Sequence, residues 1–141
     1  MNYLLDTNAC AVLINGPRER DPFAQVRSRF ARMRAGGERF AISSVVVHEL
    51  WYGVAKSMRV PANTERLLNF LSSQFDLVDF STEDARAAGN IRAELERNGT
   101  RIGEYDTLIA GQALARGMTL VTANVREFGR VEGLRLEDWT Q

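Results

Sequence analysis

Three acidic residues stand where the surrounding sequence favours apolar or small side chains. Asp6 directly follows the apolar run 3–5, which is typical of a short strand that ends at this carboxylate. On a helix, the residues three and four positions away from Glu49, and likewise from Asp106, are apolar or small. An ionised carboxylate in such a stripe is costly unless a cation compensates it. One such acid alone is also typical of a turn, a helix N-terminus or a buried ion pair, so the hypothesis of a common site rests on all three together.

Carboxylates gathered without histidine or cysteine ligands favour a hard metal ion. His48 is the only histidine and Cys10 the only cysteine, which excludes a zinc site built from Cys and His. Mg²⁺ prefers oxygen ligands, keeps several waters and commonly needs one or two carboxylates together with a substrate phosphate. The sequence therefore predicts hydrolysis of a phosphodiester with Mg²⁺ or Mn²⁺. In this hypothesis Asp6 and Asp106 hold the ion, and Glu49 completes its ligands or orients the attacking water.

Further polar residues close to these acids in the sequence are predicted to support them. Thr7 and Asn8 add oxygen atoms to the turn that follows Asp6. Thr122 and Asn124 follow a predicted strand that ends at the same edge of the sheet. Thr122 is expected to hydrogen-bond a carboxylate and Asn124 to hold a metal-bound water, although both residue types are equally typical of turns.

Short apolar stretches alternate with amphipathic helical patterns, which predicts an α/β domain with a mostly parallel sheet. The expected strands are 3–5, 40–42, 77–78, 118–121 and 134–136. The expected helices are 9–14, 22–34, 44–57, one that begins near Pro61, one from the capping box at 81–84 to Asn98-Gly99, and one from Glu104 or Tyr105 to Gly117. In an open parallel sheet the carboxyl ends of the strands border the ligand crevice, so these elements are expected to gather the acids at one edge.

The basic residues are almost all arginine. The chain has 18 basic and 18 acidic residues, so its net charge of zero gives no sign of nucleic-acid binding. Lys56 is the only lysine, however, and arginine suits phosphate because its planar group donates two parallel hydrogen bonds. A local basic patch for an RNA backbone is predicted from five arginines: Arg27, Arg29, Arg32, Arg34 and Arg39. The alternative interpretation of this run is a solvated helix face.

The length of 141 residues favours one domain that spans 1–141. The longest apolar run, 42–47, is far shorter than the roughly 20 residues that cross a bilayer. The first residues lack the pattern of a secretory signal, and a single cysteine fits a reducing compartment. We therefore expect a cytoplasmic protein that does not bind a membrane.

Five segments of the chain resemble the PIN-domain ribonucleases, and most of all the VapC toxins of bacterial toxin–antitoxin modules. These segments are 4–8, 43–53, 102–111, 121–128 and 131–139. The first four follow the order and spacing of that family, and the resemblance covers nearly the whole chain. It implies a PIN fold, a Rossmann-like three-layer α/β/α domain with a parallel sheet ordered 3-2-1-4-5.

The resemblance also implies an activity and partners. The family is one of metal-dependent endoribonucleases, and its VapC members inhibit translation by cleaving a structured RNA such as a tRNA, leaving a 5′-phosphate and a 3′-hydroxyl. The three acids of the family correspond to Asp6, Glu49 and Asp106, and its supporting hydroxyls to Thr7 and Thr122. The resemblance further implies a homodimer and a VapB-type antitoxin that places a cation against the acids.

Two features depart from the family pattern, and one other function stays open. Many PIN domains carry a fourth acid where this chain has Asn124, which puts a second metal ion in doubt more than a first. Glu104, two residues before Asp106, is interpreted as a helix cap, with a contribution to the site as the alternative. The alternative function is a catalytically weak PIN module that acts through an antitoxin in nucleic-acid binding and regulation. A phosphoacceptor receiver domain is disfavoured, because Lys56 lies about two turns beyond Glu49 and not beside the acids.

Overall fold

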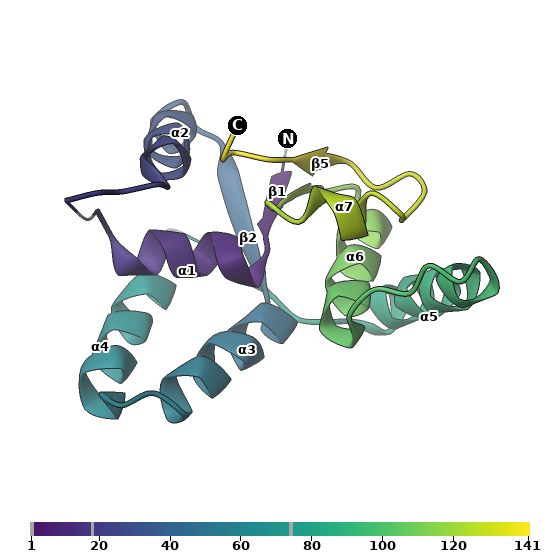
Figure 1. Ribbon diagram of the computed structural model, residues 1–141, viewed down its shortest axis with the longest axis horizontal. Coiled ribbons are helices and arrows are strands. Elements are labelled where there is room, and N and C mark those ends of the chain that lie inside the picture. The colour runs from purple at the N-terminus through teal and green to yellow at the C-terminus, as the bar shows by residue number, and fades with distance from the viewer. Residues whose placement is uncertain (1, 18, 74) are drawn as a thin grey trace.

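A parallel sheet of five strands forms the middle layer of the molecule (Figure 1). The structure is a computed structural model, and it describes residues 2–17, 19–73 and 75–141. The strands are β1 (Asn2–Leu5), β2 (Arg39–Ser43), β3 (Asp76–Val78), β4 (Thr119–Val121) and β5 (Leu136–Glu137). They lie in the order β3-β2-β1-β4-β5 and every neighbouring pair is parallel, which confirms the predicted order.

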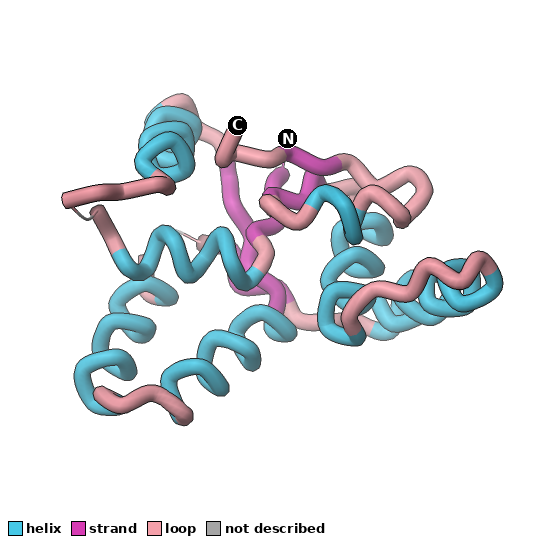
Figure 2. The backbone as a smooth tube through the Cα atoms, viewed as in Figure 1, coloured by secondary structure: helices cyan, strands magenta, loops and turns pink. Residues whose placement is uncertain are grey.

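Helices cover both faces of this sheet, as Figure 2 shows with the strands between two groups of helices. They are α1 (Thr7–Asn15), α2 (Ala24–Ala35), α3 (Ser44–Ala55), α4 (Val60–Leu71), α5 (Thr82–Arg97), α6 (Glu104–Arg116) and the single turn α7 (Val125–Phe128). Together these elements give the three-layer α/β/α arrangement that was predicted. Among the described residues, none of these helices combines the length and apolarity needed to cross a bilayer.

The core lies where the central strands meet the helices of both layers. Leu4 and Leu5 of β1 and Leu120 of β4 are completely buried, and so are Val46 of α3 and Ile109 of α6. Successive residues of β1 are buried on both faces, as expected for a parallel strand covered by helices on either side. The carboxyl end of β1, and with it Asp6, is therefore fixed at the centre of the molecule.

A close approach between α5 and α6 sets the position of α6. A Cβ atom added to Gly111 of α6 would lie 2.6 Å from the backbone nitrogen of Ala88 in α5. Only glycine permits this approach, because no real side chain fits at that distance. The predicted capping box at the start of α5 is confirmed, since Ser81 and Asp84 each bond the backbone N–H of the other. The first feature fixes how closely α6 packs against α5, and the second fixes where α5 begins.

Most predicted elements are confirmed, with differences at their ends. Helix α3 ends at residue 55 and not at 57, helix α2 begins at 24 and not at 22, and the last strand is 136–137 and not 134–136. No helix was expected between the fourth and fifth strands, but α7 occupies 125–128. A helix of one turn is too short to produce a visible apolar periodicity.

Candidate active site

Asp6 lies at the junction of the sheet and the first helix. Its backbone N–H donates to the carbonyl of Val121 at 3.2 Å, which aligns the ends of β1 and β4. Its side chain is buried and caps α1 by accepting the N–H of Ala9 at 2.8 Å. Burial raises the pKa of Asp6, although bonds from Thr122 and Ala9 oppose this and the charge of Glu49 adds to it. Asp6 therefore serves as a helix cap and also presents a carboxylate to the other acids.

Glu49 reaches the same place from the second turn of α3. Ser43 begins this helix by accepting the N–H of Val45 at 3.1 Å. The hydroxyl of Thr7 donates to Oε1 of Glu49 at 2.8 Å. This bond joins the first residue of α1 to α3 and fixes the direction in which the Glu49 carboxylate points.

Asp106 enters from the first turn of α6 and is half-buried. Its pKa is raised to about 6, first by burial and then by the negative charges of Glu49, Glu127 and Asp6. The three predicted acids therefore do act on one another, and Glu127 of α7 joins them. We call Asp6, Glu49, Asp106 and Glu127 the acid cluster.

Glu127 is the one member of the acid cluster that was not predicted. It lies in α7, where Nδ2 of Asn124 donates to its Oε2 at 3.1 Å. The resemblance directed attention to Asn124 itself, whereas the acid stands three residues later. On one turn of helix these two residues face the same side, so the spacing 124–127 is the signal that would have revealed it.

The predicted supporting residues differ in how closely they approach the acids. Thr122 is buried, stabilises the ionised form of Asp6, and accepts the backbone N–H of Asn124 at 2.9 Å. Asn8 is exposed on α1. Glu104 is the exposed first residue of α6, but Gly103 occupies the capping position, so Glu104 acts there only through its charge near the helix N-terminus. The roles of Asn8 and Glu104 in a site stay predictions.

Among the described residues, no three acidic, histidine or cysteine side chains are close enough to enclose a metal ion by themselves. This does not exclude the predicted kind of site, because water and a substrate phosphate commonly complete the ligands of Mg²⁺. The chemistry of the cluster fits such an ion. Its donors are all carboxylate oxygens, and after burial, the negative charges of the neighbouring acids contribute to the raised pKa of Asp106.

Most of the predicted arginine patch is already engaged. Ion pairs join Arg27 to Asp21, Arg29 to Glu137 at 2.8 Å and Arg39 to Asp76 at 2.8 Å. Arg34 lies over the rings of Phe30 and Phe75, and Arg32 is exposed on α2. The acids that pair with Arg29 and Arg39 are distant in the sequence, so the run of arginines itself does not reveal these two pairs. A role of these five arginines in RNA binding stays a prediction.

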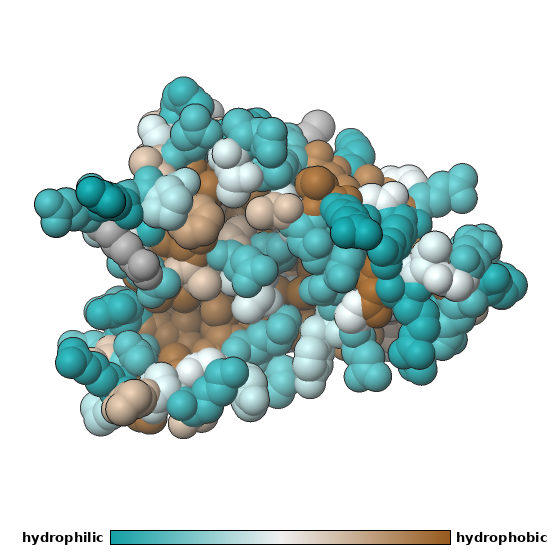
Figure 3. Space-filling view, viewed as in Figure 1, coloured by the Kyte–Doolittle hydropathy of each residue, from teal (hydrophilic) through white to brown (hydrophobic). Residues whose placement is uncertain are grey.

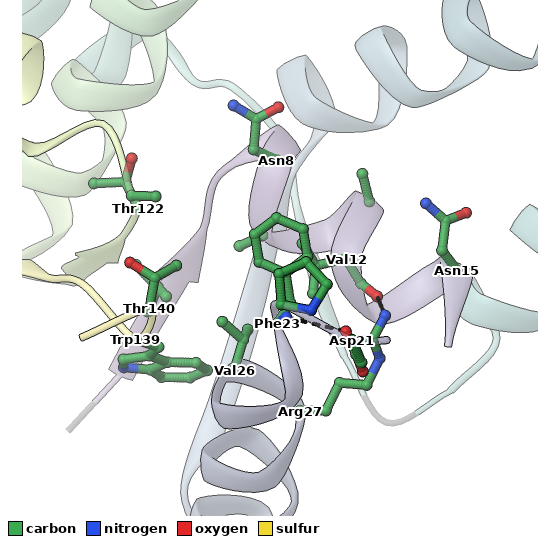
Figure 4. A pocket seen from close by; sticks show the side chains of 15 residues that line it. Asn8, Val12, Asn15, Asp21, Phe23, Val26, Arg27, Thr122, Trp139 and Thr140 are labelled. Atoms are coloured by element: carbon green, nitrogen blue, oxygen red, sulfur yellow. Dashed lines mark hydrogen bonds and ion pairs between the residues drawn. The ribbon is translucent and has the colours of Figure 1, made fainter. Parts of the chain in front are cut away.

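Two apolar hollows lie on either side of α1. One, of about 360 Å³, separates α1 from α2 and has Val12, Phe23 and Val26 around it, with Asn8 and Thr122 at one end (Figure 4). The other, of about 220 Å³, is bordered by α1, α3 and α4. Figure 3 shows the second as a brown depression in an otherwise mostly hydrophilic face. Apolar surface of this kind beside a charged site is typical of a binding surface.

Comparison with known proteins agrees with the fold. The PIN domain family matches residues 3–134. The chain is 43% identical over 141 residues to the tRNA(fMet)-specific endonuclease VapC of Shigella flexneri, covering 99% of both chains. It is 40% identical over 139 residues to the protein of that name from Salmonella typhimurium, covering 99% of this chain and 98% of the relative.

A solved structure agrees equally well. In the crystal structure of VapBC2 from Rickettsia felis, bound to a DNA fragment from their promoter, one chain superposes with a TM-score of 0.86. That chain is 40% identical, and 99% of each chain is covered. A family match over most of the chain, relatives at this identity and a shared fold lead to one conclusion. The chain belongs to the PIN-domain family and, within it, to the VapC ribonucleases.

Proposed function

We propose that this protein is an endoribonuclease that depends on Mg²⁺ or Mn²⁺ and uses the acid cluster as its active site. The observation that carries the proposal is the gathering of carboxylates from the end of β1 and from α3, α6 and α7, where burial and then the charges of Glu49, Glu127 and Asp6 raise the pKa of Asp106 to about 6. A fold keeps like charges together at such a cost mainly where function needs them. The VapC membership of the chain supports the same activity.

In the proposed mechanism each acid has a part that its surroundings support. Asp6 and Asp106 would hold the ion, while Glu49 would complete its ligands or orient the attacking water. Thr7 fixes Glu49 through its 2.8 Å hydrogen bond, and Thr122 keeps Asp6 ionised. When bound, the metal ion activates water and neutralises charge on the departing phosphodiester oxygen. In-line attack then leaves a 5′-phosphate and a 3′-hydroxyl.

We propose a structured RNA as the substrate, and the initiator tRNA as the first to be tested. Two relatives are named as tRNA(fMet)-specific endonucleases, and each covers nearly all of this chain. Cleavage of this RNA would inhibit translation, which suits the toxin of a toxin–antitoxin module. This activity is assigned to the cytoplasm, where tRNA acts.

We propose a VapB-type antitoxin as the protein partner, on the grounds that solved relatives are VapBC complexes. The two apolar hollows beside α1 offer that partner a surface next to the acid cluster. A cation of the antitoxin placed against the carboxylates would offset their repulsion and exclude the metal ion. The homodimer stays a prediction as well.

The test of the activity is cleavage of purified initiator tRNA and elongator methionine tRNA by the intact chain and by Asp6→Asn. We expect cleavage with Mg²⁺ or Mn²⁺, none after chelation, and loss of cleavage in Asp6→Asn while the fold is kept. Equal cleavage by Asp6→Asn would reveal a contaminating nuclease and contradict the proposal. Metal-independent binding of RNA without any cleavage would instead support the catalytically weak alternative.

The test of the partner is expression of the chain together with the gene next to it. We expect a small antitoxin chain to co-purify and cleavage to be suppressed. A VapC chain that purifies alone from such a strain would contradict this part of the proposal.

A further inference from the structure

Two aromatic rings contact each other between α3 and α6, the helices that carry Glu49 and Asp106. His48 of α3 directly precedes Glu49, and Tyr105 of α6 directly precedes Asp106. Their ring centroids are 5.5 Å apart, with the ring planes inclined by 48°. The contact therefore brings together two rings whose chain neighbours are both members of the acid cluster.

This pair differs from the aromatic contacts of the core. The ring centroids of Tyr3 in β1 and Phe40 in β2 are a similar 5.6 Å apart, but both residues are almost completely buried in the core. Tyr105 is instead 48% exposed, and His48 is exposed too. Burial of these rings thus contributes little to folding, because much of their apolar area stays in water. The backbone position of each is nevertheless fixed, since each residue lies within a helix.

Unpaired nucleobases are the ligands that suit such a pair. Without a bound metal ion the acid cluster repels phosphate, so neutral groups nearby can add an affinity for RNA that does not depend on charge. Aromatic side chains supply it by stacking, because every base presents a π-face. The phenol and imidazole groups can also hydrogen-bond the edge of a base.

A neighbouring groove provides a path for the adjoining backbone. A hollow of about 370 Å³ between α5 and α6 is bordered by Glu104 and Leu108, which flank Tyr105 along α6, and by Arg92 and Arg101. Arg101 is exposed, and Arg92 forms an exposed ion pair with Glu96 at 3.4 Å. Such arginines remain available to a phosphate, because an exposed pair contributes little free energy.

We propose that His48 and Tyr105 form a stacking platform that holds one unpaired base of the RNA beside the acid cluster, with the strand continuing along the groove toward Arg101. The platform rests on the proposed ribonuclease function and specifies how that substrate is held. It is a binding element: Tyr105 provides most of the stacking area, and His48 supports its ring.

The test measures binding and cleavage of a fluorescein-labelled single-stranded RNA of about ten nucleotides, long enough to cover one such site. Binding is followed by fluorescence anisotropy with Ca²⁺ in place of Mg²⁺, and cleavage with Mg²⁺. We expect Tyr105→Ala to weaken binding and raise KM by about tenfold while kcat stays within about twofold. Tyr105→Phe, which keeps the ring, should restore both values, and His48→Ala should cost about threefold.

Abasic RNAs decide whether the ring contacts a base. A series carries one abasic site at successive positions. At one position the intact chain should lose about tenfold in affinity, and Tyr105→Ala should then cause no further loss. An equal loss for Tyr105→Ala on every abasic RNA would overturn the platform, because the ring would then act through the fold or the backbone.

Two control measurements distinguish the platform from a general surface effect and from a protein interface. Tyr52→Ala removes a ring that is 60% exposed on the same helix as His48, but one turn farther along, and it should leave RNA binding unchanged. An equal effect of Tyr52→Ala would overturn the assignment to His48 and Tyr105. So would a Tyr105→Ala protein that binds RNA normally but loses its antitoxin or changes its sedimentation from dimer to monomer, since the rings would then serve a protein interface.

Failure of the platform and failure of the proposed function give different results. Ring-dependent binding without cleavage would refute the nuclease function and support the platform. Metal-dependent cleavage with an unchanged KM in Tyr105→Ala would refute the platform and leave the nuclease function intact.

Discussion

An acidic side chain lies beside each end of α6, Asp84 of α5 at the C-terminal end and Asp106 at the N-terminal end, and their pKa values are shifted in opposite directions. Near its C-terminal end, Arg116 donates to Asp84 from Nε at 3.2 Å and from Nη2 at 2.9 Å, and the N–H of Ser81 adds a third bond at 2.8 Å. The Asp84 side chain is only 1% exposed. Burial alone would raise its pKa, but the bonds from Arg116 and Ser81 outweigh burial and lower it.

At the N-terminal end the balance is reversed. Asp106 is less buried than Asp84, yet burial and the charges of Glu49, Glu127 and Asp6 raise its pKa to about 6. Degree of burial therefore does not distinguish a structural acid from a functional one. The distinction lies in what faces the carboxylate: a cation and N–H donors at Asp84, and other carboxylates at Asp106. A carboxylate left repelling its neighbours marks the site at which a cation is expected to bind.

The largest expected effect that tests this comparison is that of Asp106→Asn on cleavage. Loss of a residue that merely supports a metal ligand commonly costs 10- to 100-fold, so loss of a ligand should cost more than about a hundredfold. The free energy of unfolding without metal should stay equal or increase, because a repelled charge is removed. Cleavage kinetics and urea denaturation in chelator measure the two quantities. A destabilised Asp106→Asn protein would show that Asp106 is a structural acid.

Asp84→Asn should give the opposite pair of results. Removing the charge weakens bonds to Arg116 and Ser81, so we expect the free energy of unfolding to fall by about 2 kcal/mol. The cleavage rate of the folded fraction should remain close to that of the unsubstituted chain. Arg116→Gln removes the other partner of the same ion pair, and we expect it to lower the free energy of unfolding by a similar amount. If Asp84→Asn kept its full stability but cleaved RNA much more slowly, Asp84 would be a functional acid and the contrast with Asp106 would be wrong.

The dependence of stability on pH should also differ in sign between the two acids. The folded protein keeps its proton on Asp106 up to a pH of about 6, whereas an unfolded Asp loses it near 3.8. The folded state therefore binds more protons between these values, and the contribution of Asp106 to stability is lost as pH rises through about 6. For Asp84, whose pKa is lowered, the contribution is present above 3.8 and is lost as pH falls below it.

Denaturation curves in chelator, recorded from pH 3 upward at roughly one curve per pH unit, measure how the free energy of unfolding changes with pH in both ranges. Asp106→Asn should abolish the decline between about 4 and 6, and Asp84→Asn should weaken the decline in acid. Saturating Mg²⁺ should reverse the first decline, because an ion that binds only the folded state stabilises it. An unchanged curve for Asp106→Asn would contradict the assignment.

A smaller effect is expected at Glu127, which extends the comparison to the residue that was not predicted. Glu127→Gln should lower the pKa of Asp106 and weaken divalent-ion binding by about tenfold, a value typical of groups around metal ligands. Glu104→Gln is the matched control on α6. It should shift the pKa of Asp106 less than Glu127→Gln does and change the affinity for the divalent ion by less than about twofold. NMR titration of Asp106 and Mn²⁺ binding measure them. Equal effects of the two variants would assign Glu127 only a general charge effect.

Local patterns of the sequence determined the fold class and drew attention to three of the acids. The strand at Asn2–Leu5, the capping box at Ser81 and the break at Gly117 depend on residues within a few positions of each other, so they can be identified in the chain alone. Asp6, Glu49 and Asp106 stood out for the same reason, because each contradicts its immediate neighbours. The resemblance to PIN domains then supplied the order of the strands.

Only the tertiary structure decided what each charge faces. Arg29 meets Glu137 across 108 positions of the chain, and Thr7 meets Glu49 across 42. Pairings at such separations leave no local pattern, so the sequence predicted free arginines where the fold has ion pairs, and it gave no sign of Glu127 or of the contact between His48 and Tyr105. Coulomb energy and ring contacts depend on distance in space, and that distance exists only after the sheet has brought the helices together.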